Sequence, residues 1–366
     1  MKDSRIAKLA KDTMEYSVSL LPGEKVLIEA WDGCDDFVVE FVKAAQAVGA
    51  YPYVVREDKK VLRSIMLQAD EAYWRKWYEY QLGRMEDMDA FVAIRKDGNA
   101  YEFADVPAEK FALYNKYNSM LHEKQRNFKL KWCILRYPSP SMAQLSATST
   151  EAFEDFFFAA NCIDYKRLNE IALSLCRVCN RTDQVRIVAP GTDITFSIKG
   201  MCEMRSCCGM FNRPCGETGM GIVQGTANGT IRYNIPSHYK GTLFTDVELT
   251  FRDGVIVHAT ANDTKRLNQI LDTDPGARRI GEFAIGFNPL ITKPMNDTLF
   301  DEKMRMSLHF TPGNGGNNPS EIHWDLVQSH DPAYGGGEIW FDDVLVRKDG
   351  IFVVPELECL NPENLK

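Results

Sequence analysis

Residues 25–57 contain the pattern that most restricts how this chain can fold. The run KVLIEA (25–30) is short and apolar, residues 35–48 repeat apolar side chains at helical spacing, and YPYVVRE (51–57) again has strand character. Gly49 is suited to end the helix, because glycine adopts a left-handed conformation without a steric penalty. A strand, a helix and a strand at this spacing form a βαβ unit, which implies parallel strands in one sheet.

The rest of the N-terminal half continues this alternation. Strands are predicted at 90–96 and 131–138, and helices at 8–21 and in the stretch that follows Thr148. Neither GxGxxG nor GxxxxGK[ST] occurs in the sequence, so no motif supports a nucleotide-binding role. We therefore predict an N-terminal α/β domain over residues 1–184, with an open and mainly parallel sheet.

The second half has a different pattern. Strand-like runs joined by Gly and Asp-Gly turns occur at 185–190, 193–200, 229–236, 241–260 and 339–355. A helix is predicted at 264–271. A chain of 366 residues suits two domains. The second is predicted to be an α+β, largely antiparallel metal-binding domain over residues 185–366.

Charge and composition restrict the partners. The formal net charge is −8 and the chain has no basic tract, which argues against binding to nucleic acid or to an anionic membrane. The N-terminal twenty residues are amphipathic and lack the apolar core of a signal peptide or a membrane span. A cytoplasmic protein is expected, with its ten cysteines mostly reduced.

The stretch LHFTPGNGGNNPSEIHWDL (308–326) holds the first candidate site. It contains His309, His323 and Asp325, although the whole chain has only six histidines. If EIHWDLV is extended, His323 and Asp325 leave the same face of a strand, and the glycine-rich turn can bring His309 alongside. Imidazole and carboxylate groups together form part of a metal site. The alternative is that each residue is simply a hydrogen-bonded histidine or aspartate.

Two glutamates in the second half differ from ordinary surface charge. Glu217 follows Pro214-Cys215-Gly216 in a turn-rich stretch, and Glu282 lies within the apolar run RRIGEFAIGFNP. A carboxylate in an apolar run is costly to bury unless it is paired, hydrogen-bonded or bound to a metal. Both are therefore candidate functional residues.

Several motifs, in order along the chain, carry a family resemblance. They are PGEKVLIEA, AAQAVGAYPYVV, GTDITFSIKG, NRPCGE, ANGTI, DTDPGARRIGEFAIGFNP, FDEKMRMSLHF, SEIHWD and DDVLVRKDGIFVVPEL. Together they resemble the aminopeptidase T family of thermophilic-type metallo-aminopeptidases, which includes leucyl aminopeptidases of that type. The resemblance covers nearly the whole chain. It implies a hydrolase that acts on peptides with a free N-terminus, and a homodimer.

The resemblance also implies a ligand set. Motif positions of the family's metal ligands match Glu217, Glu282, His309, His323 and Asp325. These donors suit two divalent ions per chain, Zn²⁺, Co²⁺ or Mn²⁺. The expected chemistry is a metal-activated water that attacks the scissile carbonyl, with Glu217 as a candidate general base.

Two departures from the family pattern bear on efficiency. Family members carry a tyrosine seven residues after the first histidine, where this chain has Gly316, and the loop 312–319 is several residues short. We therefore expect reduced turnover, unless Tyr334 supplies the phenol. The sequence PCGETGMGIV around Glu217 also differs from the family's, which predicts an altered wall of the site.

Other functions remain open at this stage. His309, His323 and Asp325 alone would form the ligand set of a non-haem Fe(II) ring-cleaving dioxygenase, a class that resembles the same peptidase family. The presence of Glu217 and Glu282 argues against a single-iron site. A non-catalytic binding protein on the same fold is a third hypothesis. The pair Cys176 and Cys179 lacks the second CxxC of a zinc ribbon, so buried thiols are expected there.

Overall fold

The computed structural model describes residues 3–127, 130–203 and 206–365. It divides into two compact units, the first formed by residues 1–163 with 209–214 and the second by 164–208 with 215–366. The predicted division at 184/185 falls after helix α8 (Tyr165–Arg181), which belongs to the second unit. The reason is that α8 contacts β8 (Glu217–Met220) and the 3₁₀ helix η3 (Pro355–Leu360), both of the second unit.

The first unit is built on a five-stranded sheet in the order β2-β1-β3-β4-β7. Its strands are β1 (Lys25–Trp31), β2 (Tyr51–Glu57), β3 (Ala90–Arg95), β4 (Lys131–Arg136) and β7 (Phe211–Arg213). Every neighbouring pair is parallel. The predicted parallel α/β organisation of this half is confirmed.

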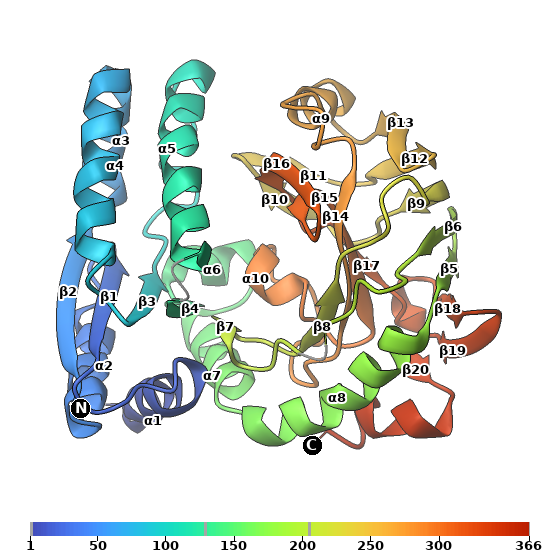
Figure 1. The fold of residues 1–366 in the computed structure, drawn as a ribbon, viewed down its shortest axis with the longest axis horizontal. Coiled ribbons are helices and arrows are strands. Elements are labelled where there is room, and N and C mark those ends of the chain that lie inside the picture. Colours follow the sequence, from blue (N-terminus) through green and yellow to red (C-terminus); the bar gives the residue numbers. More distant parts are fainter. Residues whose placement is uncertain (1–2, 128–129, 204–205, 366) are drawn as a thin grey trace. The chain divides into compact units, whose positions relative to one another are not determined.

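Helices of the first unit follow the strands along the chain. They are α1 (Ser4–Asp12), the π-helical turn η1 (Thr13–Ser17), α2 (Asp35–Ala47), α3 (Lys59–Gln68), α4 (Glu71–Met85), α5 (Ala108–Asn127), α6 (Pro140–Leu145) and α7 (Thr150–Asn161). The first helix begins earlier than predicted because Asp3 caps it. Helices α3, α4 and α5 extend beyond the carboxyl ends of the strands (Figure 1). Among the described residues, no helix is long and apolar enough to cross a membrane.

One strand of the first unit comes from a distant part of the sequence. Residues 209–214, here called the inserted segment, leave the second unit and add β7 to β4. Arg213 fixes the segment, because its buried guanidinium donates hydrogen bonds of 2.8 Å to Ser17 Oγ and to the carbonyl of Asn161. This return was not predicted from the sequence, since a strand of three residues is too short to show a periodic pattern.

The second unit contains antiparallel sheets. The larger has the order β13-β12-β9-β6-β5-β18-β19-β20, and a second has the order β16-β15-β14-β8, with β17 also paired to β15. The larger is formed by β5 (Gln184–Ala189), β6 (Thr192–Ser197), β9 (Asn228–Arg232), β12 (Glu248–Arg252), β13 (Val255–Thr260), β18 (Glu338–Phe341), β19 (Val344–Lys348) and β20 (Ile351–Phe352). The second is formed by β8, β14 (Ile280–Gly286), β15 (Ser307–Gly315), β16 (Asn318–His323) and β17 (Val327–Ser329). The predicted α+β organisation is confirmed.

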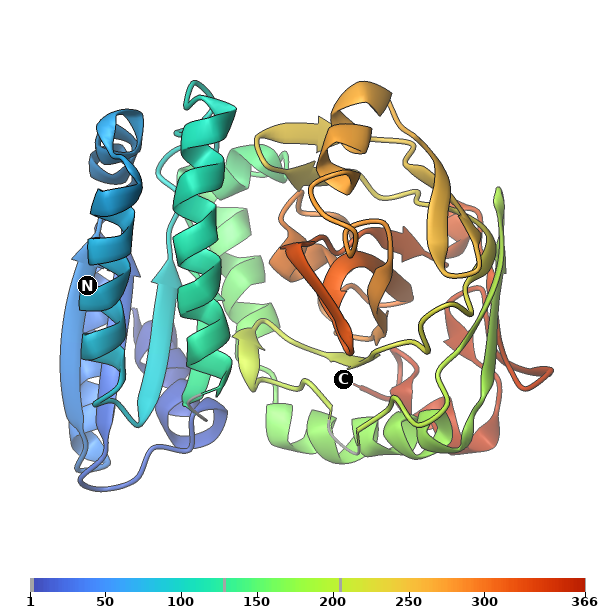
Figure 2. The ribbon, with the colours of Figure 1, turned by 45° about the horizontal axis from the view of Figure 1, so that its top comes forward.

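Aromatic side chains join the two sheets of this unit. Phe196 of β6 packs against Phe283 of β14 and Phe310 of β15, with ring centroids 5.0 and 4.7 Å apart. Because side chains alternate along a strand, His309 and Glu282 leave the opposite face. Figures 1 and 2 show β14, β15 and β16 in orange, between α9 (Thr264–Leu271) and α8. Helix α9 has the bounds predicted from the sequence.

The remaining elements of this unit are short. They are the hairpin of β10 (Ser237–Tyr239) and β11 (Thr242–Phe244), the helix α10 (Thr298–Asp301) and the 3₁₀ helix η2 (Pro332–Tyr334). Helix α10 precedes β15 directly, and η2 follows β17.

Candidate metal centre

The register of β8, β14 and β15 places three candidate residues on one sheet face. His309 lies opposite Ala284, and Glu217 lies opposite Gly286. A β-bulge between Ile280 and Glu282 then sets Glu282 opposite Thr311. A bulge of this kind redirects the side chain that follows it, and here the side chain of Glu282 reaches His309, as the distances below show.

Gly219 of β8 leaves room for the Glu282 carboxylate. A Cβ atom at residue 219 would approach Glu282 Oε1 to 2.3 Å, which is closer than any real contact. The glycine is therefore required by the site and not by its own backbone conformation.

Asp325 reaches the same face from outside a regular strand. Strand β16 ends at His323, so the predicted strand through Asp325 is interrupted. Residues 324–326 nevertheless stay beside β15, because Trp324 donates to the carbonyl of Pro312 at 3.1 Å and Phe310 donates to that of Leu326 at 3.2 Å. His323 and Asp325 still lie together, with Nε2 and Oδ1 3.2 Å apart.

The five predicted residues thus form one cluster. Nε2 of His309 lies 3.6 Å from Glu217 Oε2, 3.8 Å from Glu282 Oε1 and 4.0 Å from Asp325 Oδ1. Glu282, His309 and Asp325 offer ligand atoms that all lie within 4.8 Å of one another. Glu217, His309 and Asp325 are buried, Glu282 is half-buried and His323 is exposed.

Backbone carbonyls orient both imidazoles. Nδ1 of His309 lies 3.3 Å from the carbonyl oxygen of Glu302, and Nδ1 of His323 lies 2.6 Å from that of Asn314. In a neutral ring the nitrogen that faces a carbonyl carries the proton, so the lone pair is on Nε2. This is the support that metal-binding histidines receive in proteins.

A buried cation and a further carboxylate, which the sequence analysis missed, adjoin the cluster. Lys303 Nζ forms ion pairs with Glu217 Oε1 and, at 2.6 Å, with Glu302 Oε1. Both residues follow α10 and are buried. Their only sequence signal was their place in FDEKMRMSLHF, because adjacent Glu and Lys are usually solvated.

The charges of the cluster displace the pKa values of its members. Burial alone would lower the pKa of His323, but the carboxylate of Asp325 outweighs it and raises that pKa to about 10. The pKa of His309 is also raised, because its bond to Glu282 and the charge of Glu217 outweigh burial. Burial raises the pKa of Glu302 well above its usual range, despite the neighbouring charge of Lys303.

The donor set fits a divalent cation. Among the described residues, Oε2 of Glu217 is buried without a hydrogen-bond donor, although it faces His309. A buried carboxylate oxygen without a donor is unfavourable, and a metal ion would satisfy it. Imidazole nitrogens and carboxylate oxygens together suit Zn²⁺, Co²⁺ or Mn²⁺.

The predicted tyrosine position lies in a tight hairpin turn. β15 ends at Gly315 and β16 begins at Asn318, so Gly316 is in a two-residue turn. Its φ is +53°, and a Cβ there would lie 2.9 Å from the Cα of Gly221. A tyrosine therefore does not fit on this backbone.

Two other tyrosines bear on this point. Tyr334 lies in η2, where burial and the charges of Asp331 and Asp301 raise its pKa. Tyr239 interacts with residues of the cluster and its surroundings. Its ring stacks on that of Trp324, with centroids 4.6 Å apart. Burial raises the pKa of Tyr239, and the charge of Asp325 contributes to this rise.

The cysteine pair of the CxxC motif lies elsewhere. Cys176 and Cys179 are buried in α8, and no disulfide joins any of the ten cysteines, all of which lie among the described residues. No candidate metal group among the described residues includes these two.

Comparison with known protein families gives a match over almost the whole chain. The model of the family described as thermophilic metalloprotease (M29) matches residues 2–350. The chain belongs to this family. The resemblance to aminopeptidase T-like proteins and the prediction of a metallo-aminopeptidase-type hydrolase are thereby confirmed.

The alignments with three curated relatives cover most of this chain and most of each relative. Aminopeptidase 2 of Geobacillus stearothermophilus is 24% identical over 337 residues, which is 82% of this chain and 81% of the relative. Aminopeptidase T of Thermus thermophilus is 25% identical over 352 residues, with shares of 83% and 84%. Aminopeptidase PepS of Streptococcus thermophilus is 25% identical over 342 residues, with shares of 81% for both.

Solved structures share the fold. Wild-type AmpT from Thermus thermophilus matches with a TM-score of 0.79 and 21% identity, over 96% of this chain and 99% of that one. The 2,5-dihydroxypyridine dioxygenase from Pseudomonas putida KT2440 matches with a TM-score of 0.60 and 13% identity, over 97% and 99%. At these identities the likeness concerns the fold alone.

Proposed function

We propose that this chain is a metal-dependent aminopeptidase that removes N-terminal residues from peptides. The observation that carries the proposal is the surroundings of His309 Nε2, which has carboxylate oxygens from three chain segments within 4.0 Å. The curated relatives support the reaction class, since all three are aminopeptidases by name.

In this proposal two divalent ions, Zn²⁺, Co²⁺ or Mn²⁺, are held by five residues: Glu217, Glu282, His309, His323 and Asp325. When bound, the ions would supply an activated water and polarise the scissile carbonyl. Asp325 Oδ1 lies 4.0 Å from Nε2 of His309 and 3.2 Å from Nε2 of His323, so this carboxylate would hold an ion together with these imidazoles. The two backbone carbonyls that hold Nδ1 keep the rings fixed while substrate binds.

Glu217 is proposed as the general base. One oxygen is paired with Lys303, and the other faces His309 without a donor among the described residues. That oxygen faces the cluster, so Glu217 would be able to accept a proton from the attacking water as well as help to hold the ions. The ion pair with Lys303 fixes the orientation of the carboxylate.

Three further parts of the proposal rest on the family resemblance. They are the homodimer, the peptide substrates with a free N-terminus and a reduced turnover that follows from the glycine at position 316. A phenol that donates to a developing oxyanion is absent from that position, and such a donor typically contributes about 2.7–4 kcal/mol. The cytoplasmic location is proposed from the N-terminal sequence and the cysteine content.

Metal content and peptidase activity test the proposal together. The purified protein should contain about two Zn, Co or Mn ions per chain, in line with the two-ion site proposed above. It should also hydrolyse aminoacyl-p-nitroanilides when Co²⁺, Zn²⁺ or Mn²⁺ is added. An N-acetylated substrate is the matched control, and it should not be cleaved because its α-amino group is blocked. Two bound ions without hydrolysis of any free-amino substrate would contradict the reaction class.

The same measurement separates the other hypotheses. A single iron per chain would favour the dioxygenase, whose ligands would be His309, His323 and Asp325. The close approach of Glu217 and Glu282 to His309 does not suit that ligand set. No metal at all would favour a non-catalytic binding protein.

A further inference from the structure

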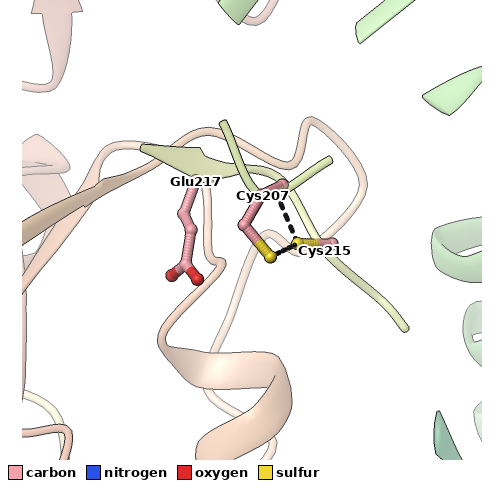
Figure 3. A group of neighbouring side chains, drawn as sticks. All are labelled: Cys207, Cys215 and Glu217. Carbon is pink, nitrogen blue, oxygen red and sulfur yellow. Dashed lines mark hydrogen bonds between the residues drawn. The ribbon is translucent and has the colours of Figure 1, made fainter. Parts of the chain in front are cut away.

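Two cysteines adjoin the cluster and have no role in the proposed reaction. Figure 3 shows the sulfur atoms of Cys207 and Cys215 side by side, with Glu217 next to them. The two Sγ atoms are 2.6 Å apart, and Cys215 Sγ also lies 2.5 Å from the carbonyl oxygen of Cys207. The sulfur of the neighbouring Cys208 lies 3.2 Å from Ser206 Oγ.

The backbone holds the two cysteines in this position. Cys207 and Glu217 form an antiparallel bridge, with N–H to carbonyl distances of 3.1 and 3.2 Å. At Cys215, the N–H donates to the Tyr165 hydroxyl at 2.9 Å, and the carbonyl accepts from Asn288 Nδ2 at 2.7 Å. The approach of the sulfur atoms is therefore built into the local fold and does not depend on a mobile loop.

Cys207 and Cys215 lie on either side of the inserted segment, so a bond between them would affect this segment. The segment, 209–214, carries β7 into the first unit. A bond between them would close the chain into a ring at the point where the segment leaves the second unit and returns.

We propose that Cys207 and Cys215 form a reversible disulfide that closes the inserted segment. The sulfur of Cys207, which is half-buried, attacks H₂O₂; an S–O bond forms, the O–O bond breaks, and the departing hydroxide takes the thiol proton and leaves as water. The sulfur of Cys215 then attacks that of Cys207, the S–S bond forms, and a second water leaves with the hydroxyl oxygen and the thiol proton. The dithiol loses two electrons and the peroxide gains them; a dithiol reductant reverses the change by exchange.

A soft metal ion held by Cys207, Cys215 and Glu217 fits the geometry less well. Two thiolates on one Zn²⁺ lie about 3.8 Å apart, given tetrahedral Zn–S bonds of about 2.3 Å, whereas these sulfur atoms are far closer. A disulfide, with sulfur atoms about 2.05 Å apart, needs only a small shift.

The test uses the whole reduced protein and does not depend on peptidase activity, so its outcome is separate from that of the proposed function. The protein is treated with stoichiometric H₂O₂, denatured and blocked with N-ethylmaleimide, and the peptide that contains residues 207–215 is analysed by mass spectrometry. The peptide should lose two hydrogens and carry two fewer labels, and dithiothreitol should restore both. Unchanged labelling of all three of its cysteines would overturn the proposal.

Variants identify the partners. Cys208→Ser is the matched control, because it removes the neighbouring thiol, and it should still lose two labels. Cys207→Ser should lose none, and Cys215→Ser should accumulate a dimedone-reactive sulfenic acid at Cys207. Equal loss of labels in the wild type and in Cys207→Ser would assign the oxidation to other thiols and refute the pair.

Hydrogen exchange of the wild-type protein tests the closure itself. Peptides that span the inserted segment should exchange more slowly after oxidation than before it, because the ring restricts local opening. Faster exchange there in the oxidised protein would show that the bond disrupts the segment and does not close it.

Discussion

The hydroxyl of Thr311 donates a hydrogen bond of 2.7 Å to Oδ1 of Asp325. This is the same oxygen that lies between the two imidazoles of the cluster. Thr311 is buried on β15 opposite Glu282, so the bond fixes a carboxylate that comes from a segment without regular strand structure. The position of Asp325 therefore depends on a residue that is not itself a proposed ligand.

Replacing Thr311 with valine should lower metal affinity. The change keeps the shape of the side chain but removes the donor, and the loss of such a supporting bond typically weakens metal binding about 10- to 100-fold. Competition with a chromogenic chelator measures the change. Thr311→Ser retains the hydroxyl and should bind metal within a few-fold of the wild type. Equal affinities in the valine and serine variants would show that the bond has no such role.

Replacing His323 with alanine should remove metal and activity while leaving the fold largely intact. The side chain is exposed, so its removal leaves no cavity in the core. Metal content and circular dichroism of the variant test the two parts separately. Full activity with normal metal content would eliminate His323 as a ligand.

The metal-free protein should become less stable as the pH rises above neutrality. The folded protein raises the pKa of His323 from 6.5 to about 10, so the stabilisation from its pairing with Asp325 is complete below about 6.5 and is lost as the pH approaches 10. His309 contributes in the same direction, because its pKa is also raised. Urea unfolding of the apo protein at several pH values between 6 and 9 measures this loss.

The variant Glu282→Gln supplies the matched comparison. It removes a carboxylate that raises the pKa values of both histidines, so the decline with pH should be shallower, and metal affinity should fall. If the stability of the apo wild-type protein did not change with pH in this range, the proposed pairing of histidines and carboxylates in the cluster would be contradicted.

Replacing Lys303 with methionine should destabilise the protein by about 3–5 kcal/mol, since it leaves the carboxylates of Glu217 and Glu302 buried without their cation. Thermal unfolding measures the effect. The double variant with Glu217→Gln should recover part of the loss, because a carboxylate that lost its cation is then replaced by a neutral amide. Lys348→Met is the exposed control, as its pair with Glu338 spans 3.4 Å at the surface and is worth about 1 kcal/mol at most. A loss in Lys303→Met no larger than in this control would show that Lys303 does not stabilise the site.

Restoring a phenol should raise kcat more than it changes KM. The loop 312–319 must be lengthened to carry a tyrosine seven residues after His309, because the present turn at Gly316 has no room for a side chain. The gain should be roughly 10²- to 10³-fold, by analogy with an oxyanion donor. Steady-state kinetics with leucyl-p-nitroanilide provides the measurement.

Two tyrosine variants decide whether a phenol is already present. Tyr334→Phe and Tyr239→Phe should each leave kcat almost unchanged if the chain lacks this donor. A large loss in either variant, together with no gain from the lengthened loop, would show that this tyrosine already fills the role.

Sequence patterns identified those residues of the candidate site that lie in recognisable motifs. His309, His323 and Asp325 were found around one glycine loop, and Glu217 and Glu282 by their unusual surroundings and the family motifs. Lys303 and Glu302 were missed because a buried ion pair and a solvated one have the same sequence. Thr311 was missed because only the register of β14 and β15 brings its hydroxyl to Asp325.

Fold prediction reached a similar limit. The stretch after Thr148, which includes α8, was predicted to form one or two helices, since periodicity defines an apolar face, but periodicity does not say which unit that face packs against. The contacts of α8 with β8 and η3 assign it to the second unit. Strand β7 could not be predicted for the same reason, because its partner β4 lies about 80 residues earlier in the chain.

The inserted segment has a consequence for the order of biosynthesis. When residue 163 has been made, the first unit still lacks β7, and the edge of β4 has no neighbour. The ribosome must then make α8, β5 and β6 of the second unit before residues 211–213 emerge to cover that edge. An uncovered strand edge invites pairing with other chains. The nascent chain should therefore depend on chaperones most strongly between these two points, and a fragment that ends at residue 163 should aggregate.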